Sequence, residues 1–140
     1  MLVADGALLA TALFSGAAVY ITLVEHPARL GCATEVALTQ WRPSYRRATV
    51  MQASLAVIGT LLALAAWLGG AGVAWLVAGL LLGAVVPFTL VVIAPTNHRL
   101  EDRGLDASGE LTRELLRRWG RLHAVRSALS LAALSLMIFA

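Results

Sequence analysis

Four apolar stretches, each long enough to cross a membrane, constrain the fold of this 140-residue chain more than any other feature. At a rise of 1.5 Å per residue, about 20 apolar residues span the hydrocarbon core of a bilayer. The stretches lie near 2–24, 49–68, 73–94 and 110–139. Only 14% of the residues are charged, whereas a soluble domain has about 25%. The sequence therefore predicts an all-α fold over 1–140: one integral membrane domain, a four-transmembrane-helix bundle of two tandem helical hairpins.

Glycine and proline mark where these helices turn and bend. The segment 69–72 (Gly-Gly-Ala-Gly) is too short to do more than reverse the chain, and Pro87 predicts a kink in the third helix. The fourth helix opens with an amphipathic stretch at 110–118, so we expect it to begin outside the hydrocarbon and then enter it. The first stretch has no basic start, carries Asp5 and is too long for a signal peptide, which favours a membrane helix.

The positions of the basic residues predict an orientation. All 11 are arginines, and they lie within 29–47 and 99–126, whereas the N-terminus and the 69–72 turn have none. The positive-inside rule then places both arginine-bearing connections in the cytoplasm, and both termini on the non-cytoplasmic side. Because these arginines flank apolar spans, the expected partner is a lipid bilayer and not nucleic acid. We expect the inner (plasma) membrane of a bacterium.

The two halves of the chain resemble each other weakly. Segment 25–30 (Glu-His-Pro-Ala-Arg-Leu) follows the first stretch, and segment 94–100 (Ala-Pro-Thr-Asn-His-Arg-Leu) ends the third. The next helices open with Trp41-x-x-x-Tyr45 and Trp119-x-x-x-His123. This pattern predicts two hairpins related by an axis along the membrane normal. The alternative is that both halves share only the composition of a membrane interface.

Polar residues gather at the arginine-bearing helix ends, whereas the opposite end is nearly featureless. Ionisable groups at membrane depth usually face a bundle interior, so we predict that these residues converge on one cavity. The candidates are Glu25, His26, Trp41, Tyr45, Gln52, Asn97, His98, Trp119, His123 and Arg126. Other readings stay open. Trp41 and Trp119 also suit an interfacial belt, Glu25 and His26 a helix-end pair, and Gln52 a simple interhelical hydrogen bond.

A metal site is a further possibility at this end. His26, His98 and His123 with Glu25 or Glu101 would satisfy one copper, iron or zinc ion, or two of the histidines would ligate a haem. The single cysteine, Cys32, excludes an internal disulfide and a Cys-x-x-Cys site. The chain has neither the Gly-x-Ser-x-Gly motif of serine hydrolases nor a glycine-rich phosphate loop.

Several short motifs together resemble the DUF1772 family of small four-helix membrane proteins, which includes the fungal anthrone oxygenases. The resemblance covers nearly the whole chain and rests on segment 14–29, Trp41-x-x-x-Tyr45, segment 95–100 and Trp119-x-x-x-His123-x-x-Arg126. It implies an oxidoreductase, a monooxygenase that uses O2 to convert the methylene of an anthrone-type polyketide to a carbonyl. The positions that it marks as functional are Glu25, His26, Trp41, Tyr45, Asn97, Trp119, His123 and Arg126.

Under this interpretation the candidates divide into two roles. The catalytic set is Glu25, His26, Tyr45, His123 and Arg126, and the substrate-binding set is Trp41, Gln52, Asn97 and Trp119. Without a cofactor, a base such as His123, His26 or Glu25 removes a methylene proton, and Arg126 or Tyr45 stabilises the enolate oxygen. With a metal, the histidines and a carboxylate instead hold the ion that binds O2.

The main alternative is a non-enzymatic membrane protein that binds haem, a metal or a lipophilic small molecule. Its sign would be histidines paired with arginine or backbone rather than with one another. A proton-coupled transporter is disfavoured, because the far end lacks polar residues for a second gate. Small membrane bundles often associate through small-residue faces, so Gly79-x-x-x-Gly83 suggests a homo-oligomer.

Overall fold

The computed structural model describes residues 2–140, all of them in helices or short connections. The first long segment comprises α1 (Leu2–Tyr20), the π-helical turn η1 (Ile21–Glu25) and α2 (His26–Leu30). The second comprises α3 (Thr34–Ala66) and η2 (Trp67–Ala71). The third comprises α4 (Val73–Phe88), η3 (Thr89–Ile93) and α5 (Ala94–Glu101), and the fourth is α6 (Glu110–Ile138). These 4 segments are long and apolar enough to cross a membrane, which confirms the predicted all-α fold.

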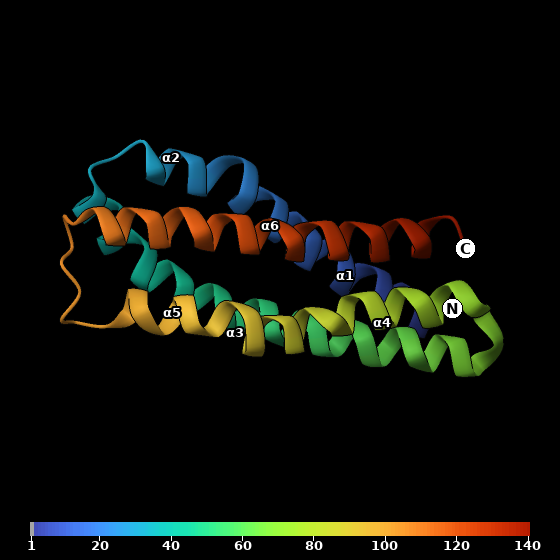
Figure 1. Cartoon of the computed structure of the whole chain (residues 1–140). Helices are drawn as coiled ribbons and strands as arrows, with labels where there is room; N and C mark the ends of the chain where they lie inside the picture. The colour runs from blue at the N-terminus through green and yellow to red at the C-terminus, as the bar shows by residue number, and fades with distance from the viewer. Residues whose placement is uncertain (1) are drawn as a thin grey trace.

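The four segments form a ring in which each helix packs on two neighbours. Both α1 and α4 pack against α3 and α6, so the order around the bundle is α1, α3, α4, α6. Figure 1 shows both termini at the end that holds the α3–α4 turn, and the other two connections together at the opposite end. We call that opposite end the arginine end. This arrangement brings the polar helix ends of both halves of the chain together.

The helices extend further toward the arginine end than the apolar stretches do. The second helix begins at Thr34, fifteen residues before the apolar stretch at 49–68. Its first turns bury Ala37, Leu38 and Trp41 on one face, while the other face carries exposed arginines. An amphipathic segment has low mean hydropathy, so a search for apolar stretches alone misses it.

Special backbone conformations occur at matching places in the two halves. The turn at the far end uses Gly70 and Gly72, with φ of 92° and 101°, values that residues with a Cβ atom rarely adopt. In the first and third segments, a five-residue π-helical turn is followed, after one intervening residue, by a proline: Pro27 after η1 and Pro95 after η3. This match agrees with the weak internal repeat.

Small residues pack the far half of the bundle, and aromatic residues pack the arginine end. In the far half, a Cβ atom on Gly59 would lie 2.7 Å from Leu82, so α3 and α4 approach closely there. Gly79 and Gly83 face Ala63 and Thr60 of α3, so these two glycines take part in the contact between α3 and α4. At the arginine end, large side chains including Trp41 and Trp119 separate the helices.

Candidate functional site

Two stacked aromatic pairs form the centre of the arginine end. On α3, the rings of Trp41 and Tyr45 are parallel within 5°, with centroids 4.7 Å apart. On α6, Trp119 and His123 stack in the same way, within 13° and 4.9 Å. Each pair has i, i+4 spacing, which places both rings on one helix face. Trp41 and Trp119 are buried, so the interpretation as an exposed interfacial belt is wrong for both.

A small cavity lies beside these pairs. Its volume is about 10 Å³, which is room for about one water molecule. Side chains from four elements line it: Ile21, Arg29, Trp41, Ser44, Tyr45, Ala48, Thr49, Gln52, Trp119, His123 and Arg126. The structure thus brings Trp41, Tyr45, Gln52, Trp119, His123 and Arg126 together, as predicted.

His123 is a buried imidazole with no hydrogen-bond partner. The residue is 1% exposed, and neither ring nitrogen makes a hydrogen bond. The backbone of Ala18 lies beside the ring but outside hydrogen-bonding geometry. A buried polar atom without a partner costs about 1–3 kcal/mol, so such groups usually meet a ligand or a water molecule. His123 is therefore free to exchange a proton with a molecule in the cavity.

Arg126 is a half-buried cation with no carboxylate partner among residues 2–140. One guanidinium nitrogen donates to Oε1 of Gln52 at 2.9 Å, and Nε has no partner. The guanidinium carbon lies 5.6 Å from the centroid of the Phe14 ring. Gln52 in turn has an unpaired amide nitrogen. Arg126 and Gln52 thus present hydrogen-bond donors, and a positive charge, that suit a negatively charged oxygen.

Asn97 lies next to this group on α5. It is buried, its Oδ1 atom has no hydrogen-bond partner, and it neighbours Tyr45. The indole nitrogen of Trp41 is also buried and unpaired. The unpaired atoms of these residues, with those of Gln52, His123 and Arg126, are concentrated at one place in the bundle. Such a concentration of unpaired buried polar atoms is typical of a ligand-binding site.

Glu25 and His26 belong to a separate network outside the cavity wall. Oε1 of Glu25 accepts hydrogen bonds from Arg29, Gln40 and Ser44. Arg29 also donates to Gln40 and, at 3.0 Å, to Nδ1 of His26. We call Glu25, Arg29, Gln40 and Ser44 the latch. It closes the cavity toward the arginine end, because Arg29 lines the cavity from one side and pairs with Glu25 on the other.

Both ring nitrogens of His26 are engaged. Nε2 lies 2.9 Å from the carbonyl oxygen of Leu116 and must donate to it, so Nδ1 accepts from Arg29 and the ring is neutral. The ring packs against Gly120, where an added Cβ atom would lie 2.5 Å from Cδ2. This pairing with arginine and backbone is the sign expected of a binding protein, but it holds for His26 and not for His123. Both ring nitrogens of His26 are thus occupied by partners within the protein.

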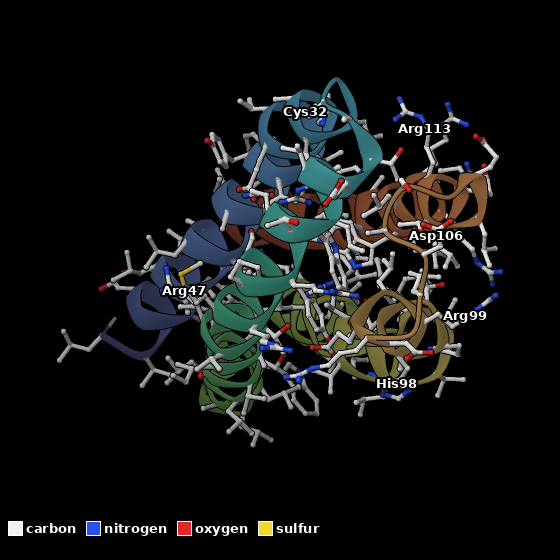
Figure 2. The ribbon with its side chains drawn as sticks, turned by 90° about the vertical axis from the view of Figure 1, so that its left-hand side faces the viewer. Cys32, Arg47, His98, Arg99, Asp106 and Arg113 are labelled. Atoms are coloured by element: carbon white, nitrogen blue, oxygen red, sulfur yellow. The ribbon has the colours of Figure 1, made fainter. Side chains whose placement is uncertain are left out.

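The predicted set of metal ligands is not assembled. His98 is exposed on α5 and lies at the outer edge of the bundle when viewed onto the arginine end (Figure 2). Within residues 2–140, no three His, Cys, Asp or Glu side chains are close enough to hold one ion. The prediction of His98 beside His26, His123 and Glu25 is therefore wrong, because the proline-containing turn of the third segment directs Asn97 inward and His98 outward.

Besides the apolar Ile21 and Ala48, four residues of the site were not among the predicted roles. Arg29, Ser44 and Thr49 line the cavity, and Gly120 admits the His26 ring. Arg29 and Thr49 share a helical stripe with predicted residues, Arg29 with Glu25 and His26, and Thr49 with Trp41 and Tyr45, a spacing that could have identified them. Ser44 and Gly120 have no such signal.

Comparisons with known proteins show the family of this chain. The family model for anthrone oxygenase matches residues 41–136, a range that begins at Trp41 and includes His123 and Arg126. The chain belongs to the anthrone oxygenase family. It is 33% identical to the anthrone oxygenase of Claviceps purpurea, over 92% of this chain and 79% of that protein. It is 34% identical to anthrone oxygenase tpcL of Aspergillus fumigatus, over 81% of this chain and 76% of that protein. No solved structure matches this member of the family.

Proposed function

We propose that this protein is a membrane-embedded oxygenase that converts the methylene group of a lipophilic, anthrone-type polycyclic ketone to a carbonyl with O2. The observation that carries the proposal is that His123 and Arg126 line the same buried cavity. His123 has no hydrogen-bond partner, and Arg126 has no carboxylate partner. The similarity to proteins named anthrone oxygenases supports the substrate class. In the overall reaction, one methylene group and one O2 give one carbonyl group and one water molecule.

His123 is the base of this proposal. The methylene of an anthrone is acidic, because loss of one proton makes the central ring aromatic. A neutral imidazole nitrogen without a partner can accept that proton. The resulting enolate carries its charge mainly on the carbonyl oxygen. The donors of Arg126 and Gln52 are suited to stabilise this oxygen, and removing such a donor typically lowers rates by about 10²–10³.

The enolate then reacts with O2 by successive one-electron steps, which form a C–O bond and give a hydroperoxide once His123 returns its proton. His123 next removes the second C–H proton, the C=O bond forms, and the O–O bond breaks with loss of hydroxide. Hydroxide takes the proton from His123 and leaves as water. The substrate supplies all the electrons, so this sequence needs no external reductant.

The surroundings suit this chemistry. Four apolar helices favour a site within a membrane, where both O2 and a polycyclic ketone dissolve more readily than in water. The latch and the buried tryptophans limit the access of water from the arginine end. Excluding water strengthens the electrostatic contribution of Arg126. We also propose that the arginine end faces the cytoplasm, as the positive-inside rule predicts.

The test is O2 consumption by purified protein with anthrone, measured with an oxygen electrode against the protein-free rate. We expect one O2 consumed per quinone formed. His123→Ala should abolish the protein-dependent rate and keep the elution volume of the wild type. The control is His98→Ala, which removes an exposed imidazole outside the cavity and should retain full activity. An active His123→Ala variant would exclude the proposed base.

The binding-protein alternative is supported by one observation, the engagement of His26 with Arg29 and Leu116. A measurement of anthrone binding under nitrogen, beside the O2 assay, separates the two functions. Saturable binding of anthrone without O2 consumption, in the wild type, would favour a carrier or binding role over catalysis.

A further inference from the structure

A second, larger space adjoins the cavity on the side away from the latch. It lies between α3, the end of α4 and η3, and its volume is about 110 Å³. Most of its lining is apolar, including Ala53, Ala56 and Val86. Leu90 of η3 and Ala53 of α3 are exposed at its mouth. We call this space the lateral groove.

The lateral groove and the cavity share one wall. Thr49, Gln52 and Arg126 line both spaces. The polar groups that suit an enolate oxygen therefore also form the polar end of an apolar groove. That combination of a mostly apolar surface with a few convergent polar groups is typical of small-molecule sites.

Size excludes the cavity alone as the site for a polycyclic substrate. A volume of about 10 Å³ admits one water molecule or O2, but not three fused rings. The rings must therefore extend past one of the cavity walls. On the latch side, Arg29 is bonded to Glu25, Gln40, Ser44 and His26. On the groove side, one hydrogen bond joins Arg126 to Gln52. The groove side is thus the less tightly held wall.

The local sequence explains why the groove exists. Ala53 and Ala56 have short side chains, which leave space between α3 and the third segment. Opposite them, the π-helical turn η3 is wider than an α-helix. Such single π-helical turns often occur at functional sites. Both elements lie within segments apolar enough to cross a membrane, so the exposed mouth of the groove faces hydrocarbon.

We propose that the lateral groove binds the apolar rings of a planar polycyclic ketone, which enters from the hydrocarbon and places its carbonyl oxygen against Arg126 and Gln52. This inference rests on the proposed function for the choice of ligand. Its experiment uses 9,10-anthraquinone, which carries no methylene to oxidise, so that binding is measured independently of turnover. The readout is quenching of the intrinsic tryptophan fluorescence in a Trp67→Phe, Trp75→Phe background, so that the signal comes from Trp41 and Trp119, which line the cavity.

Ala53→Leu fills the mouth of the groove and should raise the Kd for anthraquinone about tenfold or more. Ala132→Leu makes the same change at an exposed position of α6 outside the groove, and should leave the Kd within about twofold. Acetophenone, with one ring, should lose less affinity in Ala53→Leu than anthraquinone does. Because Ala53 is exposed, its substitution is expected to preserve folding, and the elution volume checks this.

Three results would overturn the inference. The first is an unchanged anthraquinone Kd in Ala53→Leu. The second is a raised Kd in Gln40→Leu alone, which would place the bound rings on the latch side. The third is loss of co-purifying phospholipid in Ala53→Leu without loss of anthraquinone binding, which would make the groove an acyl-chain site. If Ala53→Leu weakens anthraquinone binding but the wild type consumes no O2, the groove is a binding site for the rings and the proposed oxygenase function is wrong.

Discussion

Trp41 and Trp119 meet edge to face, with ring centroids 5.8 Å apart and planes at 85°. These residues hold equivalent positions in the two halves of the chain, and each stacks on an aromatic residue one turn further along its helix. The contact therefore joins the two hairpins at the candidate site. Trp119 also neighbours His26 and Arg29, so it links the cavity to the latch.

Arg126→Gln removes the charge at the wall shared by the cavity and the lateral groove. We expect kcat/KM for anthrone oxidation to fall by about 10²–10³, because the enolate oxygen loses its main donor. Arg126→Lys keeps the charge but loses the planar fork, and should retain intermediate activity. Steady-state O2 consumption measures both. Arg118→Gln, an exposed change on the same helix, is the control. Wild-type kcat/KM in Arg126→Gln would exclude this role.

Glu25→Gln distinguishes a latch residue from a base. It removes the ion-pair partner of Arg29, whose side chain is 3% exposed against 23% for Glu25. We expect a loss of about 1–3 kcal/mol in unfolding free energy, less than for a fully buried pair, with activity within a few-fold of wild type. Thermal unfolding in detergent and O2 consumption give the two values. Loss of activity at unchanged stability would instead make Glu25 the base.

Gly120→Ala tests the placement of His26. The new methyl group would lie 2.5 Å from Cδ2 of the ring, so the ring or α6 must shift, at a cost of about 1–3 kcal/mol. Gly16→Ala on α1 is the matched control, since a Cβ atom there meets nothing within 4 Å. We expect a lower melting temperature for Gly120→Ala alone. The double variant with His26→Ala should melt no lower than His26→Ala, and a further drop would contradict the contact.

The single cysteine reports the orientation of the bundle. Cys32 is exposed at the arginine end, between α2 and α3 (Figure 2). If this end faces the cytoplasm, a membrane-impermeant maleimide added to intact spheroplasts should leave Cys32 unlabelled, and lysis should expose it. Gly69→Cys in a Cys32→Ser background, exposed at the opposite end of the bundle, is the control and should be labelled in intact spheroplasts. Labelling of Cys32 in intact cells would reverse the proposed orientation.

The sequence predicted the helices, and much of the cavity, for separable reasons. Apolar length alone identifies membrane helices, and helical spacing places Trp41 with Tyr45 and Trp119 with His123. Spacing along one helix cannot show which neighbouring helix a residue faces. Hence the inward position of Asn97 and the outward position of His98 required the structure. The i, i+4 pair of Glu25 with Arg29 follows from spacing alone, but the bonds of Glu25 to Gln40 and Ser44 of α3 depend on packing between helices. The place of Gly120 under His26 depends on it likewise.

The edge-to-face contact has a consequence for the symmetry of the molecule. If an axis exchanges the two hairpins, it must pass between Trp41 and Trp119, since an axis lies midway between the residues that it exchanges. Yet one tryptophan presents its edge and the other its face, an arrangement that no twofold rotation preserves. The phenol of Tyr45 and the imidazole of His123 then occupy equivalent positions in the two hairpins, but their chemistry differs. A substrate with two equivalent halves would be held in a site whose own halves are distinct, with the base on one side only.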